Sequence, residues 1–196
     1  MVTYPLEQFE EWFRITGNWW PNDTDPDNLI IHVQGHAKLK WPMTQTGLLP
    51  YKFAEVSGNF DCSGAGLKEL TGSPTKVGGD FYASYNMITH LKGGPQWVGD
   101  NYLVSSCPHL VNVSDVADHV GGAFEVSFNK QMPILKPFMN STKVVLTKPA
   151  YVDTATHNEM NLAQQVLDLH AGEGRAGALK VAHALIKHKL PLMAKM

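Results

Sequence analysis

Cysteine is scarce in this sequence: Cys62 and Cys107 are the two cysteines among 196 residues. They can form at most one disulfide, which excludes a fold held together by cross-links, and we expect both to be buried thiols in a reducing compartment. Long apolar runs are also missing, since no stretch approaches the roughly 18 residues that a membrane-spanning helix needs. The N-terminal residues MVTYPLEQFEEWF carry acids where a secretory signal would be apolar. These absences predict a cytoplasmic location.

Neither sign of charge dominates the sequence. Lysine and arginine number 16 against 18 aspartates and glutamates, which gives a formal net charge of −2. A chain with this balance has no general attraction for nucleic acid or for an anionic membrane, so we expect neither as a partner. The apolar share of 43% is typical of a soluble globular protein, and the length is sufficient for one buried core.

Complete catalytic and metal-binding motifs are missing as well. Three alternate aspartates in the segment NDTDPDN resemble the start of a calcium loop, but Asn28 and Gln34 occupy the positions where such a loop needs glycine and glutamate. The segment GEGRAG lacks the Gly-Lys-Ser/Thr ending of a phosphate-binding loop, and no serine lies in a nucleophile-elbow motif. We therefore expect no metal, no cofactor and no catalytic residue.

The sequence does contain an internal repeat of about 21 residues. Four valines mark it at spacings of 21, 21 and 22 residues: Val56, Val77, Val98 and Val120. An aromatic residue follows each valine by four positions: Phe60, Phe81, Tyr102 and Phe124. A small or apolar residue comes two positions later, and asparagine or cysteine is common three positions after that. Because successive residues of a strand point to opposite faces, the aromatic residue and the residue two positions later share one face.

The pattern apolar-x-apolar-x-x-(Asn/Cys)-x-apolar resembles the leucine-rich repeat. Its short period and its Pro-x-x-Val lead-in, as in Pro74 to Val77, are similar to the bacterial subtype of that repeat. Repeats of the form VGGDFY…N…L…GGP also resemble those of phage-encoded proteins. The resemblance implies a phage or bacterial product, such as an inhibitor, that docks on a host protein and modulates it.

Neighbouring turns of such a repeat must stack, because a single turn cannot bury its own apolar face. The register extends to Val144-x-Leu146 as a last turn and to Ile31-x-Val33 as a first turn. We therefore expect an α/β solenoid with a short leucine-rich-repeat-like parallel sheet of about six strands in sequence order. The glycine pair that precedes a strand, as at Gly78, predicts a tight turn with positive φ. An antiparallel sandwich with regular turns is the alternative.

Both ends of the repeat are expected to be helical. Leu6, Phe9 and Phe13 form an apolar stripe that predicts an N-terminal helix ended by Gly17. The segment THNE, which begins at Thr156, is typical of a capping box that opens a helix, and a second helix is expected after the glycines of AGEGRAG. The predicted organisation is a helical cap and loop over residues 1–29, the solenoid over 30–152 and a helical hairpin over 153–196.

The strand face that points away from the core is the candidate binding surface. Tyr82 and Leu103 are expected to lie side by side there, bordered by acids and followed by aromatic residues at the strand exits. The candidate partner-binding residues are Asp61, Asp80, Tyr82, Tyr85, Leu103, Glu125 and Phe128. Apolar groups ringed by carboxylates on an exposed sheet predict a protein partner with a basic surface.

The expected function is therefore that of a non-enzymatic binding scaffold. Two alternatives remain open at this point. One is a small enzyme whose site lies in or beside the C-terminal helices, and the other is a virion structural component that self-associates through exposed faces.

Overall fold

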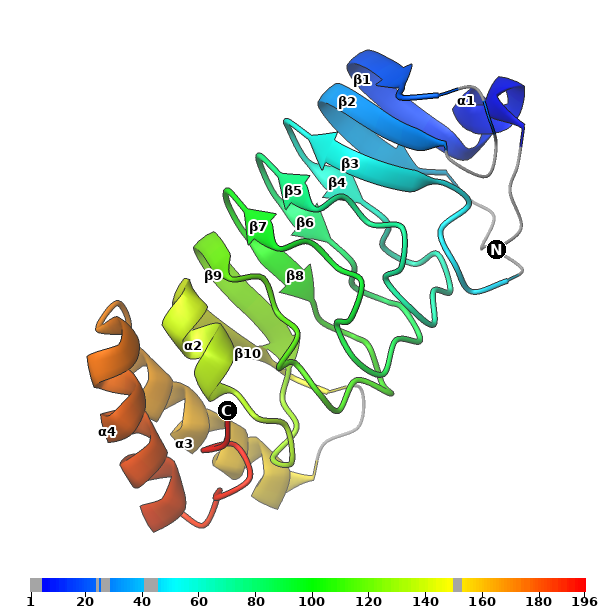
Figure 1. The fold of residues 1–196 in the computed structure, drawn as a ribbon. Helices are drawn as coiled ribbons and strands as arrows, with labels where there is room; N and C mark the ends of the chain where they lie inside the picture. Colours follow the sequence, from blue (N-terminus) through cyan, green and yellow to red (C-terminus); the bar gives the residue numbers. More distant parts are fainter. Residues whose placement is uncertain (1–4, 24, 26–28, 41–45, 150–152) are drawn as a thin grey trace.

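A computed structural model describes residues 5–23, 25, 29–40, 46–149 and 153–196. The chain winds into a β-solenoid of about five turns, built mostly of parallel sheet with a few helices (Figure 1). Successive turns stack along one axis, with the N-terminal segment at one end and the C-terminal helices at the other (Figure 1). The solenoid expected from the 21-residue repeat is confirmed.

Each inner turn contributes two short strands, one on either side of a bend. The first ladder consists of β2 (Ile30–Leu39), β3 (Lys52–Val56), β5 (Lys76–Val77), β7 (Trp97–Val98) and β9 (His119–Ser127). The second consists of β2, β4 (Phe60–Asp61), β6 (Phe81–Tyr82), β8 (Tyr102–Val104), β9 and β10 (Ser141–Thr147). With β1 (Phe13–Pro21), the described part of the chain forms one sheet of ten strands. The sequence predicted about six because its pattern located the second ladder alone.

The register of the second ladder agrees with the repeat except in its first turn. The residues that pair in successive turns are Phe60, Phe81, Tyr102, Phe124 and Val144. In the first turn Ala37, not Ile31, pairs with Phe60, and Ile31 pairs with Phe53 of the first ladder. The prediction favoured Ile31-x-Val33 because that pair is the more apolar. Ala37 precedes Phe60 by 23 residues, whereas Phe60 precedes Phe81 by 21, so the first turn departs from the period of the repeat.

A column of glycines lines the bend between the two ladders. A Cβ atom on Gly99 would lie 2.1 Å from the carbonyl oxygen of Gly78, and one on Gly121 would lie 1.9 Å from that of Gly99. These glycines do not have positive φ, contrary to the prediction. The bend requires glycine because the backbones of successive turns approach too closely for a side chain, as in the 2.9 Å hydrogen bond from Gly99 N to Val77 O.

Four aromatic rings from successive turns form the spine of the core behind the second ladder. Ring centroids lie 5.9 Å apart for Phe60 and Phe81, 4.8 Å for Phe81 and Tyr102, and 5.5 Å for Tyr102 and Phe124. All four side chains are fully buried. Each inner ring contacts the turn before it and the turn after it, so the repeat becomes one continuous core.

Tyr102 differs from the other rings of this spine by its hydroxyl group. None of the described residues offers that buried oxygen a hydrogen bond. A buried polar atom without a partner is destabilising by about 1–3 kcal/mol. Tyr102→Phe is therefore expected to raise the free energy of unfolding by about 1 kcal/mol or more, measured by urea denaturation. Tyr82→Phe is the control, because the Tyr82 hydroxyl has a partner; an equal gain in that variant would contradict the explanation.

Asn86, in the loop that follows β6, joins adjacent turns. Its side chain is fully buried, its Oδ1 accepts a 2.9 Å hydrogen bond from Leu67 N, and its Nδ2 donates to Cys62 O at 3.0 Å and to Ala83 O at 2.9 Å. Cys107 holds the equivalent position one turn on, and its Sγ donates to Ala83 O at 3.5 Å. Asparagine and cysteine at this point of the repeat therefore satisfy backbone groups of the neighbouring turn.

The two cysteines are free, buried thiols, as the sequence predicted. Burial raises the pKa of Cys62 well above the usual value for a thiol, and it also raises the pKa of Cys107. A thiol that does not ionise is a poor nucleophile, so these side chains fill space in the core.

The N-terminal end differs from the predicted helical cap. A short 3-10 turn (Leu6–Gln8) leads into α1 (Phe9–Trp12), and the chain then enters β1, which pairs antiparallel with β2. Gly17 does not end a helix. It lies within β1 opposite Gly35, and both residues have positive φ, of 110° and 138°. A Cβ atom on Gly17 would lie 2.1 Å from Gln34 O, so this close antiparallel contact is what the glycine allows.

The C-terminal end contains three helices. The predicted hairpin is present as α3 (Thr154–Leu169) and α4 (Gly174–Lys187), and α2 (Leu135–Asn140), which the repeat pattern did not predict, precedes β10. Asp153 caps α3 by accepting a 2.7 Å hydrogen bond from Thr156 N, so the cap lies three residues before the predicted one. The packing of α3 on β10 and of α4 on α2 and α3 closes this end of the core (Figure 1).

Candidate functional site

The outward side of the second ladder presents one row of side chains in register. The row runs through Lys38, Asp61, Tyr82, Leu103, Glu125 and Val145. Alternation along each strand places the row opposite the buried rings, and its side chains after Lys38 are half-buried. The structure thus places four predicted binding residues in successive turns of one face: Asp61, Tyr82, Leu103 and Glu125.

Two carboxylates of this row are held by neighbouring side chains. Lys38 Nζ lies 2.7 Å from Asp61 Oδ2, and Ser105 Oγ donates a 2.8 Å hydrogen bond to Glu125 Oε1. The ammonium of Lys38 partly neutralises Asp61, so the acidic border is weaker than the sequence suggested. Lys38 escaped the prediction because the first turn was assigned the wrong register.

Tyr82 and Asp80 form a constrained pair on this face. Tyr82 Oη donates to Asp80 Oδ2 at 2.7 Å, while Asp80 Oδ1 accepts from Asn101 N at 3.0 Å and from Asn101 Nδ2 at 2.8 Å. The hydrogen bond to Asp80, aided by partial burial, raises the pKa of Tyr82 to about 12. Partial burial acts to raise the pKa of Asp80, but the hydrogen bonds from Tyr82 and Asn101 outweigh it and hold that pKa below its usual range. Tyr82 therefore presents a neutral ring in a fixed orientation.

The two aromatic residues expected at the strand exits have different surroundings. Tyr85 is 70% exposed and has a positive φ of 60°. Phe128 is 4% exposed, so its side chain does not belong to the outward face and the prediction is wrong for this residue. The chain has left the strand at Phe128, where the alternation that predicted its direction no longer applies.

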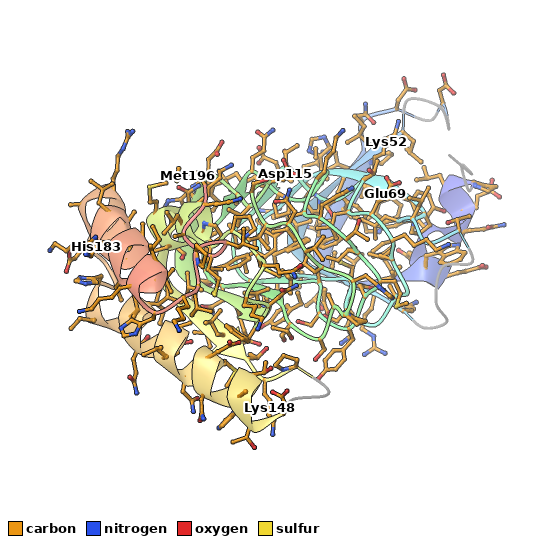
Figure 2. All side chains as sticks on the ribbon, turned by 90° about the horizontal axis from the view of Figure 1, so that it is seen from below. Lys52, Glu69, Asp115, Lys148, His183 and Met196 are labelled. Carbon is orange, nitrogen blue, oxygen red and sulfur yellow. The ribbon has the colours of Figure 1, made fainter. Side chains whose placement is uncertain are left out.

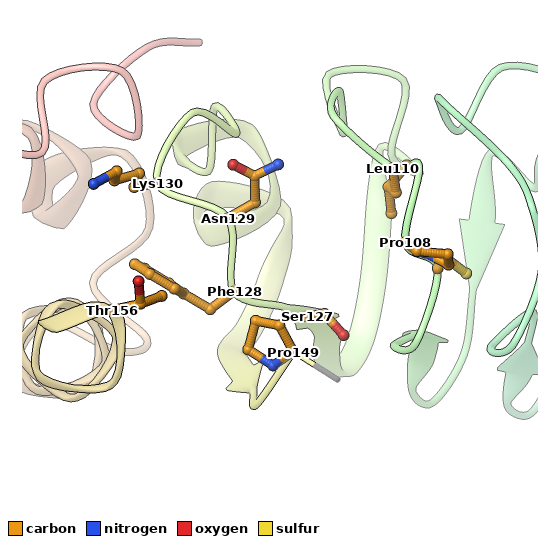
Figure 3. A pocket seen from close by; sticks show the side chains of 9 residues that line it. Pro108, Leu110, Ser127, Phe128, Asn129, Lys130, Pro149 and Thr156 are labelled. Carbon is orange, nitrogen blue, oxygen red and sulfur yellow. The ribbon is translucent and has the colours of Figure 1, made fainter. Parts of the chain in front are cut away.

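Phe128 instead lines an open cavity of about 220 Å³ between the last turns and the start of α3. Pro149 and Thr156 border it from the C-terminal side, and Pro108 lies across from them (Figure 3). Its polar groups have partners within the protein: Ser127 Oγ lies 3.2 Å from Thr147 Oγ1 and Lys130 Nζ lies 3.3 Å from Glu159 Oε2. The Ser127 hydroxyl and the Lys130 ammonium are therefore already engaged in contacts within the protein.

The first ladder carries an outward row that the sequence reasoning did not single out. Lys76, Trp97 and His119 occupy equivalent positions in successive turns. The rings of Trp97 and His119 are stacked at a centroid distance of 5.2 Å, and Lys76 Nζ lies 5.2 Å from the centroid of the Trp97 ring. These three residues each precede one of the repeated valines, so the repeat itself marks their positions. The prediction treated the valines as a lead-in to the strands and not as strands themselves.

The described residues contain no group of three or more histidine, cysteine, aspartate or glutamate side chains placed to hold a metal ion. In the segment NDTDPDN, which resembles the start of a calcium loop, Asp27 lies outside the described residues. Among the helices of the described chain, none has the length and apolarity to span a membrane. Comparison with protein-family models, with curated proteins and with solved structures finds no match. The class of protein is therefore defined by geometry, as a β-solenoid with helices at its ends.

Proposed function

We propose that the protein is a non-enzymatic scaffold that docks on another protein through the outward row of the second ladder. We assign it to the leucine-rich-repeat-like solenoids of bacteria and phages, with a host protein of basic surface as the partner that it modulates in the cytoplasm. The observation that carries the proposal is a preformed face. Tyr82 and Leu103 are adjacent in register and half-buried, and the carboxylates beside them are already held by hydrogen bonds.

Preorganisation favours binding because a surface that is already ordered loses less conformational entropy on association. The bond to Asp80 fixes the Tyr82 ring, and aromatic anchors of this kind dominate the energetics of protein interfaces. Asp61 and Glu125 lie at either side of the apolar pair, where negative charge accelerates the encounter with a basic surface.

Tyr82→Ala is expected to weaken partner binding by at least about 2 kcal/mol, because it removes the aromatic anchor. The partner is first captured from bacterial lysate with the wild-type protein and identified by mass spectrometry. The purified pair is then measured by calorimetry. Trp97→Ala is the matched control, since it also removes a partly exposed aromatic ring, but from the first ladder.

Glu125→Lys tests the electrostatic part of the proposal. Reversal of an acid at the rim is expected to slow association, more strongly at low salt, and to leave dissociation nearly unchanged. Asp80 is less suitable, because it also holds the backbone of Asn101. Stopped-flow or biosensor kinetics at two salt concentrations give the answer.

Two results would contradict the proposed face. One is loss of binding in Trp97→Ala with full binding in Tyr82→Ala, which assigns the interaction to the first ladder. The other is wild-type binding in both variants together with loss in Arg175→Glu, which assigns it to the C-terminal helices.

A further inference from the structure

The outer face of α4 is unusual for the end of a solenoid. Terminal units normally carry a polar outer face, because that face closes the stack and meets water. In α4, however, Leu179 is 77% exposed and Ile186 is 58% exposed. Their spacing of seven residues places them on the same side of the helix, where His183 also projects outward (Figure 2). An apolar stripe at this position indicates a surface that another molecule covers.

The charges carried by α4 itself and by the residues after it are positive. Residues 174–196 contain five lysines and arginines and no acidic residue: Arg175, Lys180, Lys187, Lys189 and Lys195. Lys180 forms an ion pair with Glu173 at 2.7 Å, at the start of the helix. Arg175 and Lys187 are exposed on α4 and add positive charge beside the apolar stripe, so the complementary surface is acidic.

The opposite end of the same molecule is acidic. Arg14 is the single basic residue of segment 5–25. The exposed carboxylates of this segment are more numerous: Glu7, Glu10, Glu11, Asp23 and Asp25. Lys40 lies beside this end, but its ammonium donates to the backbone carbonyl of Glu10 rather than to a side chain. Leu6 and Trp12, in the same segment as Glu7 and Glu11, are half-buried and supply an apolar surface. The two ends of the solenoid therefore differ in charge and both expose apolar groups, and they face away from each other (Figure 1).

We infer that the partner of the α4 face is the N-terminal end of a second copy of this chain, bound head to tail. In this arrangement the apolar stripe of α4, with Leu179 and Ile186, meets the surface that includes Leu6 and Trp12. The basic rim of α4 meets Glu7 and Glu11. Pairing of α4 with α4 across a two-fold axis is disfavoured, because it would bring Arg175 and Lys187 against their own counterparts.

Head-to-tail contacts are heterologous, so each added copy leaves one acidic and one basic end free for the next. Such an assembly lengthens along the solenoid axis. The outward row of the second ladder takes no part in it, so this inference is independent of the docking function proposed above.

The test uses two variants, each of which disrupts the proposed contact surface at one end of the solenoid. Leu179→Asp with Ile186→Asp removes the α4 surface, and Glu7→Lys with Glu11→Lys reverses the acidic end. In sedimentation velocity at low salt, the wild-type mass is expected to rise with protein concentration and to return to that of a monomer at high salt, where exposed charges are screened. Each variant alone is expected to be a monomer. Their equimolar mixture is expected to form a one-to-one heterodimer that does not grow further.

The control variant is Lys68→Glu with Lys92→Glu, which reverses two exposed charges of the solenoid loops, as many as the acidic-end variant reverses but with the opposite sign, and is expected to assemble like the wild type. Circular dichroism establishes that every variant melts near the wild-type temperature. A wild type that stays monomeric at all concentrations overturns the inference, as does a mixture without heterodimer. Wild-type binding to phosphatidylglycerol vesicles without self-association also overturns it, because the α4 face would then be a membrane surface.

Discussion

Phe81→Ala is expected to lower the free energy of unfolding by about 3–5 kcal/mol, the range for removal of a buried phenylalanine ring. Phe81 is fully buried and lies between Phe60 and Tyr102, at centroid distances of 5.9 Å and 4.8 Å. The cavity left by the ring would separate two turns that each depend on it. Because the backbone ladders hold those turns at a fixed spacing, the structure cannot collapse to fill the space. Urea denaturation followed by circular dichroism measures the loss.

Tyr82→Ala provides the comparison, since it removes a ring of similar size from the opposite face of the same strand. Its expected loss is about 1 kcal/mol or less, as for a substitution outside the core. Similar destabilisation by the two variants would show that the inward and outward faces of the second ladder have been assigned incorrectly.

Asn86→Leu is expected to lower the free energy of unfolding by about 3 kcal/mol or more. Leucine has the same branching as asparagine but leaves Leu67 N and the carbonyls of Cys62 and Ala83 without the hydrogen bonds that the amide supplies. Each buried backbone group without a partner is destabilising by about 1–3 kcal/mol. Asn86→Cys is the control and should lose less, because the protein itself uses Cys107 at the equivalent position, where the thiol donates to the preceding turn.

Thermal and urea unfolding of both Asn86 variants distinguish this explanation from simple packing. If leucine and cysteine at position 86 destabilise equally, the hydrogen bonds of the amide do not support the stack. If Asn86→Leu keeps the wild-type melting temperature, the polar side chains at positions 86 and 107 do not stabilise the stacking of the turns.

The parts of the fold that the sequence predicted are those in which neighbouring turns repeat the same interactions. The ring at Phe81 meets the equivalent ring of the next turn, and the side chains of Asn86 and Cys107 each bond to the backbone of the preceding turn, so the spacing of these residues records their contacts directly. The first ladder was missed because β5 and β7 each carry a single buried valine, whereas each turn of the second ladder has two apolar residues at alternate positions, such as Phe81 and Ala83. The prediction for the N-terminal end was wrong because Phe9 and Phe13 have the spacing of an amphipathic helix. Both are buried, but Phe13 lies in strand β1 and not in a helix.

The candidate face shows the same division. Alternation placed Tyr82 and Leu103 correctly, because both lie within strands whose inward neighbours are core residues. It failed at Phe128, which lies beyond β9 and is covered by the C-terminal part of the chain. Alternation also could not predict the hydrogen bond between Tyr82 and Asp80, since the spacing of residues does not show which polar atoms meet.

The glycine column of the bend has a consequence for the evolution of the molecule. Each turn meets its neighbours through the same backbone contact, so Val77 followed by Gly78 and Val98 followed by Gly99 are interchangeable junctions. A tandem duplication of residues 78–98 would join Val98 to a new Gly78 and add one turn, about 4.8 Å of length, without altering either end. The number of turns can therefore change by recombination within a gene, and the length of the outward face can change with it while its chemistry stays constant.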